Sequence, residues 1–381
     1  MSIKAIGRAR SLAIHRCLGL VFGAYLCMMG LTGTVIVFKD EISESHVLKM
    51  VTEGAGHALD VPLVPYDKCD DAFTRICKNI KTVESSTKRK VVFYKSLGAR
   101  NNLSLLTLAE SKTAGGASYA FVKCVNDSAQ VRLLDSSEPA WLQFIIDLHH
   151  NLLCGKLGRT VNGVMAVLLL ILLLSGALVL TFENGYWKTF AAAHRSRWPL
   201  RARNLHIALG GCNGPFLALM AICAIYFGFP DQVKALLGVD LKPVALDLST
   251  SNDLSNGLGK AFKLIANTSN LSTPDLDSIA MPKKNNRAVR YWFKGQMGLS
   301  NEIWTDGFNG AQLAGTTGPA RFSSESLLLW FARFHFGQWA GFFSKCMWVI
   351  LGWMPVVLYA TGCWIWSKKF KMSKKSKKSD S

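Results

Sequence analysis

The hydrophobic residues of this chain gather in four long runs that are separated by stretches of mixed polarity. The runs cover residues 17–38, 161–182, 205–229 and 346–366. About 20 predominantly apolar residues are needed for an α-helix to cross a bilayer, so each run is long enough. A soluble protein would not carry VMAVLLLILLLSGALVLTF, at residues 164–182, because such a run would invite aggregation. The pattern predicts a mostly α membrane protein with four transmembrane helices.

Two long segments between these runs show patterns typical of small α+β modules. In the first, helical periodicity at residues 67–83 precedes short predicted strands at 90–94, 103–108, 118–123 and 130–134. In the second, a helical piece at 255–266 precedes predicted strands at 289–293 and 301–304, with hairpin-type turns at Asp306-Gly307 and Asn309-Gly310. We expect one outer module in each segment.

These elements divide the chain into eight parts. They are an N-terminal segment with the first transmembrane helix (1–40), the first module (41–140), the second helix with an outer extension (141–183), a loop (184–204), the third helix (205–229), the second module (230–330), the fourth helix (331–367) and a basic tail (368–381). The part at 141–183 is either one very long helix or two abutting helices. The first apolar run is too long for a signal peptide and lacks a small-residue cleavage site, so we interpret it as an uncleaved anchor.

Charge indicates how the helices are oriented. The net charge is +19 and the mean hydropathy +0.21. Basic residues crowd into residues 4–16, 188–203 and 368–378, whereas residues 39–148 carry equal numbers of acidic and basic side chains. Lys and Arg in short flanking segments mark the cytoplasmic side, so both termini are expected inside and the modules outside. The same distribution argues against a nucleic-acid-binding protein and leaves the tail to set topology and to contact anionic lipid.

The spacing of histidines and glycines repeats along the chain. His15, Gly19 and Gly23 follow the pattern H-x3-G-x3-G, and so do His206, Gly210 and Gly214. His149 and His335 both begin the pattern H-x5-G-x3-[RK]-x16-G, which includes Arg159 and Gly176 in one copy and Lys345 and Gly362 in the other. We infer that the first two helices are duplicated as the third and fourth.

This repeat suggests a chemistry. Residues spaced by four lie on one helix face, so each glycine strip presents a flat surface below its histidine. Such a surface suits close helix packing, and it also suits a flat porphyrin whose iron is held by the histidine. His15 with His206 at the inner depth, and His149 with His335 at the outer depth, predict two bis-histidine haems of b type. A covalent haem is excluded because no C-x-x-C-H motif is present.

Several alternatives stay open at this point. The glycine strips, taken alone, favour a packing role. Arg159 and Lys345 are either partners of haem propionates or side chains that reach the lipid headgroups. His150 is a substitute ligand candidate. His335 lies 11 residues before the fourth apolar run, which places it about 16 Å beyond the run on a continuous helix and leaves room for a non-haem metal site.

The cysteines add one open question. Most of the ten lie in or beside the apolar runs and are expected to pack there. Cys69 and Cys77 fall in the first module, where an oxidising space would permit a disulfide between them.

The segments 13–42, 147–180, 204–229 and 334–366 resemble the PepSY-associated transmembrane family. These are iron-regulated bacterial inner-membrane proteins, among them haem-containing periplasmic ferric-siderophore reductases. The resemblance covers nearly the whole chain and implies that the outer modules are degenerate PepSY units. The third helix departs from the pattern because it lacks the Thr-Gly pair found near the end of the first, and Ala224-Ile225 stands in that place.

The resemblance implies a reductase of the bacterial inner membrane. Electrons would enter at His15 and His206, pass to His149 and His335, and reduce the Fe(III) of a siderophore in the periplasm. The partners would be a ferric siderophore, membrane lipid and an electron donor. No nucleotide or flavin motif is present, so the donor is expected to be another membrane protein or a quinol. The alternatives are a non-enzymatic PepSY-type binding or regulatory protein and, ranked below it, a transporter.

Overall fold

The computed structural model of the chain consists of two compact units. It describes residues 3–54, 57–59, 72–97, 103–109, 118–125, 128–181, 200–238, 258, 260–261, 276–281, 288–293, 301–307, 310–315 and 324–379. A helical unit comprises Met1–Lys39, Ala140–Val239 and Leu327–Ser381, and a sheet unit comprises Asp40–Pro139 and Asp240–Ser326. Each unit is described by itself.

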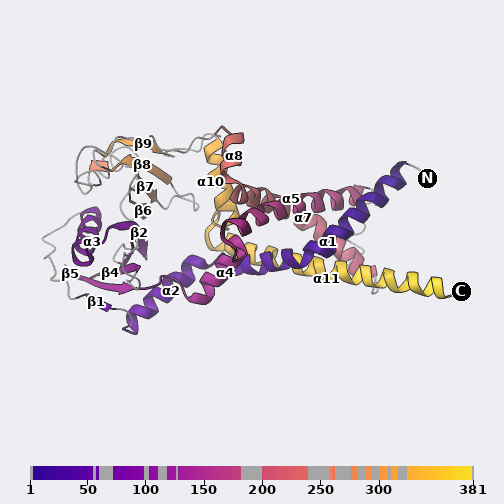
Figure 1. The fold of residues 1–381 in the computed structure, drawn as a ribbon, viewed down its shortest axis with the longest axis horizontal. Helices are drawn as coiled ribbons and strands as arrows, with labels where there is room; N and C mark the ends of the chain where they lie inside the picture. The colour runs from indigo at the N-terminus through magenta and orange to yellow at the C-terminus, as the bar shows by residue number, and fades with distance from the viewer. Residues whose placement is uncertain are drawn as a thin grey trace. The chain divides into compact units, whose positions relative to one another are not determined.

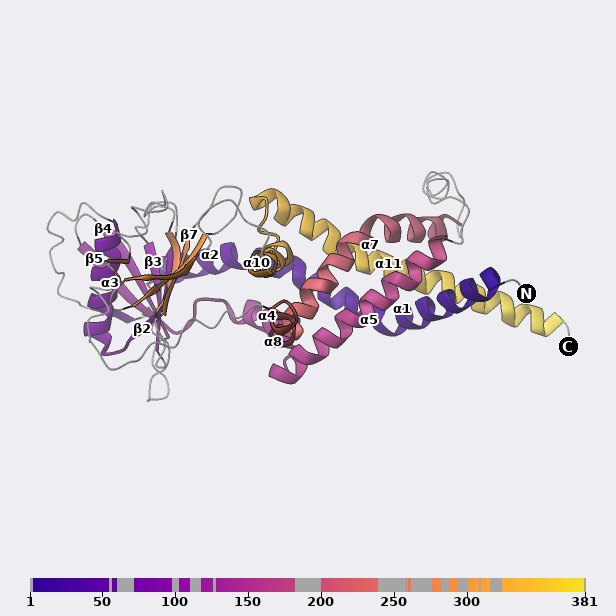
Figure 2. The same ribbon diagram turned by 90° about the horizontal axis from the view of Figure 1, so that it is seen from above.

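Four long helices form the frame of the helical unit. They are α1 (Ile3–Ile36), α5 (Gly155–Thr181), α7 (Leu200–Gly228) and α11 (Gly341–Ser379), and each is long and apolar enough to cross a membrane. Helix α1 packs against α5 and α11, and α7 packs against the same two helices (Figures 1 and 2). The prediction of four transmembrane helices is confirmed.

Small residues let two pairs of these helices cross closely. A Cβ atom added to Gly30 of α1 would collide with the backbone oxygen of Gly352 in α11. A Cβ added to Gly228 of α7 would lie 2.5 Å from the Cα of Gly163 in α5. Helices in membranes associate through such close backbone contacts because the surrounding lipid removes most of the hydrophobic driving force between them. These glycines therefore fix the distance between neighbouring helices.

A sharp bend precedes α5 and another precedes α11. Helix α4 (Ala140–Asn151) ends at residues with positive φ, Leu152 at 51° and Leu153 at 60°, before α5 begins. Helix α10 (Ser324–His335) ends before Gly337 and Gly341, whose φ angles are 64° and 57°. The left-handed region is strained for residues other than glycine and ends a helix. Of the two readings of segment 141–183, the two-helix one is therefore correct.

The sheet unit contains one antiparallel sheet of nine strands. In sheet order these are β1 (His57–Leu59), β5 (Ser128–Leu134), β4 (Tyr119–Val125), β3 (Leu103–Leu108), β2 (Val91–Leu97), β6 (Leu276–Ala280), β7 (Ala288–Phe293), β8 (Asn301–Asp306) and β9 (Gln312–Gly315). Strands β2 and β6 pair antiparallel at the centre, with Tyr94 opposite Ile279. The strands of the two expected modules therefore continue into one sheet, and this pairing removes the exposed edge that β2 would otherwise present.

Helices cover part of each face of the sheet. Ile76, Ile80 and Val83 of α3 (Ala72–Thr87) enter one core with buried residues of strands from both segments. Val47 of α2 (Lys39–Thr52) enters a second core with Leu97 and neighbouring strand residues.

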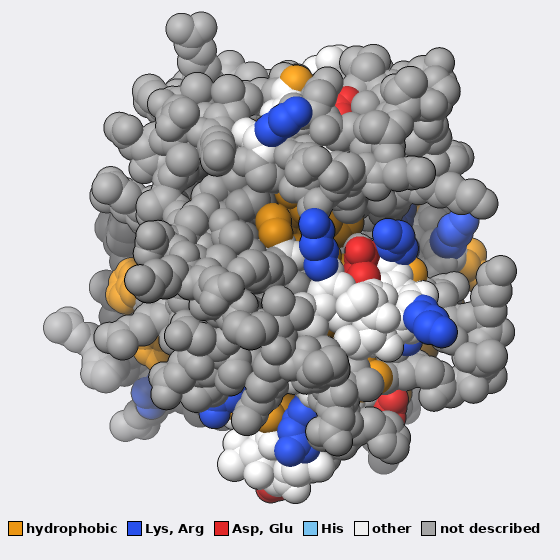
Figure 3. Space-filling model, turned by 90° about the vertical axis from the view of Figure 1, so that its left-hand side faces the viewer, with side chains coloured by type: hydrophobic (Ala, Val, Ile, Leu, Met, Phe, Trp, Pro, Cys, Tyr) orange, Lys and Arg blue, Asp and Glu red, His pale blue; other side chains and the backbone are white. Residues whose placement is uncertain are grey.

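On the face seen in Figure 3, the described residues show basic side chains beside fewer acidic ones.

Some of these strands and helices were predicted from the sequence and others were not. The four strands predicted in the first segment correspond to β2, β3, β4 and β5, and the two predicted in the second correspond to β7 and β8. The sequence did not predict helix α2, the strands β1, β6 and β9, or the short helix α8 (Pro230–Leu236). Most of the helical piece predicted at 255–266, and Cys69 of the expected disulfide, lie outside the described residues.

The pairing of β2 with β6 can be tested by a cross-link. Phe93 and Ala280 face each other in register, and Cα atoms of such pairs lie about 4.5–5.5 Å apart, within the range of a disulfide. The variant Phe93→Cys/Ala280→Cys should lose two free thiols on mild oxidation, as counted by maleimide labelling. In the control Phe93→Cys/Trp304→Cys, Trp304 lies two strands beyond β6, so both thiols should stay free. Equal labelling of the two variants would refute the pairing.

The helix crossing at Gly30 should be intolerant of any side chain. Gly30→Ala would force α1 away from the Gly352 backbone, and we expect the unfolding temperature in detergent to fall by several degrees. Gly214→Ala is the matched control, because nothing lies within 4 Å of a Cβ added there. Alanine is favoured over glycine within a helix by about 1 kcal/mol, so this control should be neutral or stabilising. The crossing would be disproved if both variants unfolded at the wild-type temperature.

Candidate functional site: two histidine pairs

The four histidines of the repeat form two pairs within the helical unit. The ring centroids of His15, on α1, and His206, on α7, are 6.2 Å apart, with an interplanar angle of 80°. Those of His149, at the end of α4, and His335, at the end of α10, are 6.3 Å apart, with an angle of 57°. The structure thus brings together the same partners that the spacing of the repeat predicts.

The distance within each pair fits a shared metal ion. A metal–imidazole bond is about 2 Å long, and the ring centre lies about 1 Å behind the bonded nitrogen. Two imidazoles on opposite sides of one metal ion therefore have centroids about 6 Å apart. Both pairs match this separation.

Two of the histidines bond a threonine hydroxyl through Nδ1. The Thr32 hydroxyl donates to the Met28 carbonyl at 2.7 Å and lies 2.8 Å from Nδ1 of His149. The Thr361 hydroxyl donates to the Val357 carbonyl at 2.8 Å and lies 2.9 Å from Nδ1 of His206. A hydroxyl has one hydrogen, which is directed here to its own helix, so it accepts from Nδ1–H of the imidazole.

His15 reaches the same state through a carbonyl. Its Nδ1 donates to the Leu172 carbonyl at 3.1 Å, and the Ser175 hydroxyl donates to the same oxygen at 2.8 Å. In His15, His149 and His206 the proton is therefore on Nδ1, and Nε2 keeps its lone pair. Histidines that bind a metal have this arrangement, in which the other ring nitrogen donates to a carbonyl or a similar acceptor.

His335 differs from the other three. Its Nδ1 is buried and has no hydrogen-bond partner among the described residues.

The spacing of the repeat shows which residue of α7 takes the place of Thr32. Thr32-Gly33 stands 17 and 18 residues after His15, and the same spacing from His206 leads to Cys223-Ala224. The expected place at Ala224-Ile225 is therefore wrong by one residue. Helix α7 has no hydroxyl at the place where its counterpart α1 has Thr32.

A glycine near each of these three acceptors makes room for the imidazole. A Cβ atom added to Gly33 would lie 3.3 Å from Cε1 of His149, and one added to Gly176 would lie 2.9 Å from Cε1 of His15. A Cβ on Gly362 would lie 3.5 Å from Cε1 of His206. Ser175-Gly176 and Thr361-Gly362 both stand 26 and 27 residues after a histidine of the repeat. This recurrence was the signal that could have identified Ser175 and Thr361.

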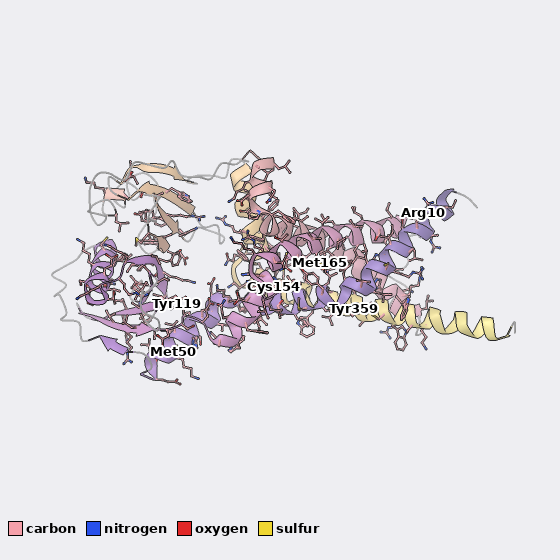
Figure 4. The ribbon with its side chains drawn as sticks, viewed as in Figure 1. Arg10, Met50, Tyr119, Cys154, Met165 and Tyr359 are labelled. Atoms are coloured by element: carbon pink, nitrogen blue, oxygen red, sulfur yellow. The ribbon has the colours of Figure 1, made fainter. Side chains whose placement is uncertain are left out.

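The glycine strips below His15 and His206 are not uniform. A Cβ added to Gly23 would collide with the ring of Tyr359, which Figure 4 labels on α11, so Gly23 serves helix packing. Cβ atoms on Gly19 and Gly210 would only touch leucine methyl groups, each at 3.8 Å, and Gly214 faces open space.

The two basic residues of the repeat also differ. Arg159 is exposed, whereas Lys345 is 8% exposed, with its Nζ 5.9 Å from the centre of the Phe38 ring. His150 is exposed, and its ring lies 6.0 Å from that of His149.

The bends determine the depth of the second pair. Asn162 Nδ2 donates to the His149 carbonyl at 2.8 Å, and Trp348 Nε1 donates to the His335 carbonyl at 3.3 Å. Both donors stand thirteen residues after their histidine. The idea that His335 lies about 16 Å beyond the apolar run is wrong, because the chain turns back at the bend and does not continue as one helix.

The two pairs are separated by most of a membrane thickness. Thr32, which contacts His149, is 17 residues from His15 along α1. That spacing corresponds to about 25 Å of helix, close to the roughly 30 Å hydrocarbon core.

A cavity adjoins His149 and His335. It holds about 1060 Å³ of unfilled space, counted together with the open space at its mouth. Its lining is largely apolar and includes Met165, labelled in Figure 4, with Phe216, Ala224 and Trp348. An apolar cavity beside two imidazoles suits a flat, largely apolar cofactor.

Burial keeps the second pair uncharged. It lowers the pKa of His149 to about 3, helped by the neighbouring His335 and His150, and it lowers the pKa of His335 to about 4, helped by His150. Both rings are therefore neutral at pH 7, the form that binds a metal.

In the part of the chain that the structure describes, no cluster of three or more His, Cys, Asp or Glu side chains could hold a free metal ion.

These pKa values predict how stability depends on pH. Between pH 6.5 and about 4 the unfolded chain binds more protons than the folded chain, so the free energy of unfolding should fall as the pH drops through this window. Each histidine contributes at most about 1.4 kcal/mol per pH unit. Thermal unfolding of the haem-free protein in detergent from pH 7.5 to 4.5 measures the effect, and His335→Gln should flatten the curve. An unchanged slope in this variant would contradict the assignment.

Comparison with known proteins agrees with this architecture. No curated protein matches the chain. A family model described as the PepSY-associated TM region matches residues 12–369, a stretch that contains α5, α7, most of α1, α11 up to the basic tail, and all four paired histidines. The chain belongs to the PepSY-associated transmembrane family.

Proposed function

We propose that this chain is a membrane haem protein that carries electrons across the bilayer and reduces ferric iron in siderophores at the outer face. The observation that carries the proposal is the geometry of the two histidine pairs. Each has the centroid separation of two ligands on one metal ion, and the Nδ1 bonds of three histidines leave Nε2 free.

The residues fit two haems of b type. His15 and His206 would hold one, and His149 and His335 the other. A haem with two histidine ligands changes between Fe(III) and Fe(II) and so accepts and donates single electrons. Thr32, Thr361 and the Leu172 carbonyl orient three of the rings, and the fourth ring, that of His335, lines the largely apolar cavity.

The duplication inferred from the sequence supports two equivalent sites. Leu172 lies opposite Gly19 and accepts from His15, and Leu358, at the matching place in α11, lies opposite Gly210. Asn162 and Trp348 likewise occupy matching places and close the two bends. The helix pairs α1–α5 and α7–α11 are therefore proposed as two copies of one unit.

The direction of transfer follows from the charge distribution. The basic termini and the basic loop at 184–204 place His15 and His206 near the cytoplasm. His149 and His335 then face the periplasm of a bacterial inner membrane. Electrons would enter from a quinol or another membrane protein and leave at the outer pair.

Ferric siderophores are the substrates that the family resemblance favours. Siderophores hold Fe(III) through hard oxygen ligands, and reduction to Fe(II) weakens this binding and releases the metal for uptake. The two segments of the sheet unit are the outer segments by the charge rule, and we propose that they bind the ferric siderophore.

A second candidate is a PepSY-type binding or regulatory protein without redox activity. One observation favours a binding surface on the sheet. Arg290 lies 4.4 Å from the centre of the Trp292 ring and 4.8 Å from that of Trp304. Such a half-buried cation–π cluster is a common recognition element. This candidate requires the histidine pairs to be structural and the protein to lack haem.

Reduction can be tested with a matched pair of metal complexes. Dithionite-reduced, desalted protein is mixed with a ferric siderophore, and the haem bands are followed together with Fe(II) captured by a chromogenic chelator. We expect reoxidation of the bands and one Fe(II) for each electron lost. The gallium(III) complex of the same siderophore has the same charge and shape but cannot be reduced, and it should leave the bands unchanged. Stable bands with the ferric complex would exclude this substrate class.

The fit of the inner pair can be tested at Gly176. A Cβ at this position would lie 2.9 Å from His15 Cε1, so Gly176→Ala should displace the ring and reduce haem content from about two per chain to about one. The control Val164→Ala changes an exposed residue of the same helix outside the cavity lining and should keep both. Haem is quantified by absorbance per mole of protein. Full haem content in Gly176→Ala would argue against His15 as a ligand.

A further inference from the structure

The four histidines are alike in sequence but not in their hydrogen bonds. His15, His149 and His206 each donate Nδ1–H to an oxygen of a neighbouring helix. The Nδ1 of His335 has no such acceptor among the described residues and is surrounded instead by rings, with Phe227 at 5.1 Å and Phe336 at 5.8 Å between centroids. Three rings thus have an oriented acceptor and one does not.

This difference changes how strongly each ring binds ferric iron. An acceptor on Nδ1–H raises the basicity of the opposite nitrogen, and a more basic ligand stabilises Fe(III) over Fe(II). Hydrogen bonding around the axial ligands is one of the means by which a protein sets a haem potential. A ligand without an acceptor therefore raises the reduction potential.

We propose that His335, whose Nδ1 has no acceptor among the described residues, gives the outer haem a higher reduction potential than the inner one. Thr32, Thr361 and the Leu172 carbonyl act as positioning groups that lower the potential at the other three ligands. Electron transfer from the His15–His206 pair to the His149–His335 pair is then favourable. This inference rests on the proposed haem function and adds a direction to it.

Position 223 is where the acceptor is missing. Cys223 is fully buried, and it stands at the distance from His206 at which Thr32 stands from His15. Ala224, the next residue, lines the cavity that also contains His335. A threonine at position 223 would place its hydroxyl as Thr32 does, with its hydrogen directed to the preceding turn and a lone pair toward His335.

The experiment adds the missing acceptor. Cys223→Thr introduces the hydroxyl, and Cys223→Val, which has nearly the same shape but no hydroxyl, is the control. Both are made in the full chain and in a His15→Ala background, where only the outer haem is expected. Potentials are measured by spectroscopic redox titration, and the ligand field by the low-spin electron paramagnetic resonance spectrum.

The expected result is a lower potential for the outer haem in Cys223→Thr. A tenfold change in the reduction equilibrium corresponds to 59 mV for one electron. Changing the hydrogen-bond partner of a metal-bound histidine typically changes metal affinity by about tenfold or more. Cys223→Val should leave the potential unchanged. Conversely, Thr361→Val should raise the potential of the inner haem, and Thr361→Ser should restore it.

Two outcomes would overturn the inference. One is an outer potential that is the same in Cys223→Thr and Cys223→Val while both retain haem. The other is a wild-type outer haem with the lower of the two potentials. If His15→Ala does not fold, the test is read in the two-haem protein, where only one of the two titration steps should shift. A wild-type protein without haem would instead refute the proposed function itself, so the two failures are distinguishable.

Discussion

The hydrogen bond from imidazole Nδ1 to an oxygen of a neighbouring helix is the interaction around which the helical unit is built. It fixes which nitrogen keeps its lone pair, and it fixes the direction of that lone pair. The other helix pairs approach closely through glycines, at Gly30 and Gly352 between α1 and α11 and at Gly163 and Gly228 between α5 and α7. A glycine beside the acceptor completes the arrangement, since a side chain at Gly176 would occupy the space of the His15 ring.

The bends before α5 and α11 serve the same arrangement. A continuous helix would carry His149 and His335 into the water beyond the membrane. The turns at Leu152 and Gly337 end the preceding helices, and the side chains of Asn162 and Trp348 bind the histidine carbonyls. The second pair therefore lies beside Thr32 and Gly33, within the apolar part of α1. Burial at this depth makes both rings neutral.

The sequence was most informative where spacing alone decides the structure. Apolar runs of bilayer length identified the four helices, and equal spacings identified which histidines are partners. The acceptors on Thr32 and Thr361 were not recognised, because a hydroxyl partner on another helix leaves no local pattern. The bend after His149 was also uncertain, since Leu152 and Leu153 are not residues that usually adopt positive φ. The junction of β2 with β6 could not be foreseen, because pairing between strands far apart in the chain depends on the whole sheet.

The central claim is that each histidine pair holds one haem between two imidazoles. Electron paramagnetic resonance of the oxidised, detergent-purified protein, combined with haem quantified per chain, tests it most directly. The account predicts about two low-spin haems per chain in the wild type. It also predicts the loss of the outer low-spin signal alone in His335→Ala. A wild-type protein that contains no haem, or whose haem is high-spin with a single histidine ligand, would contradict it.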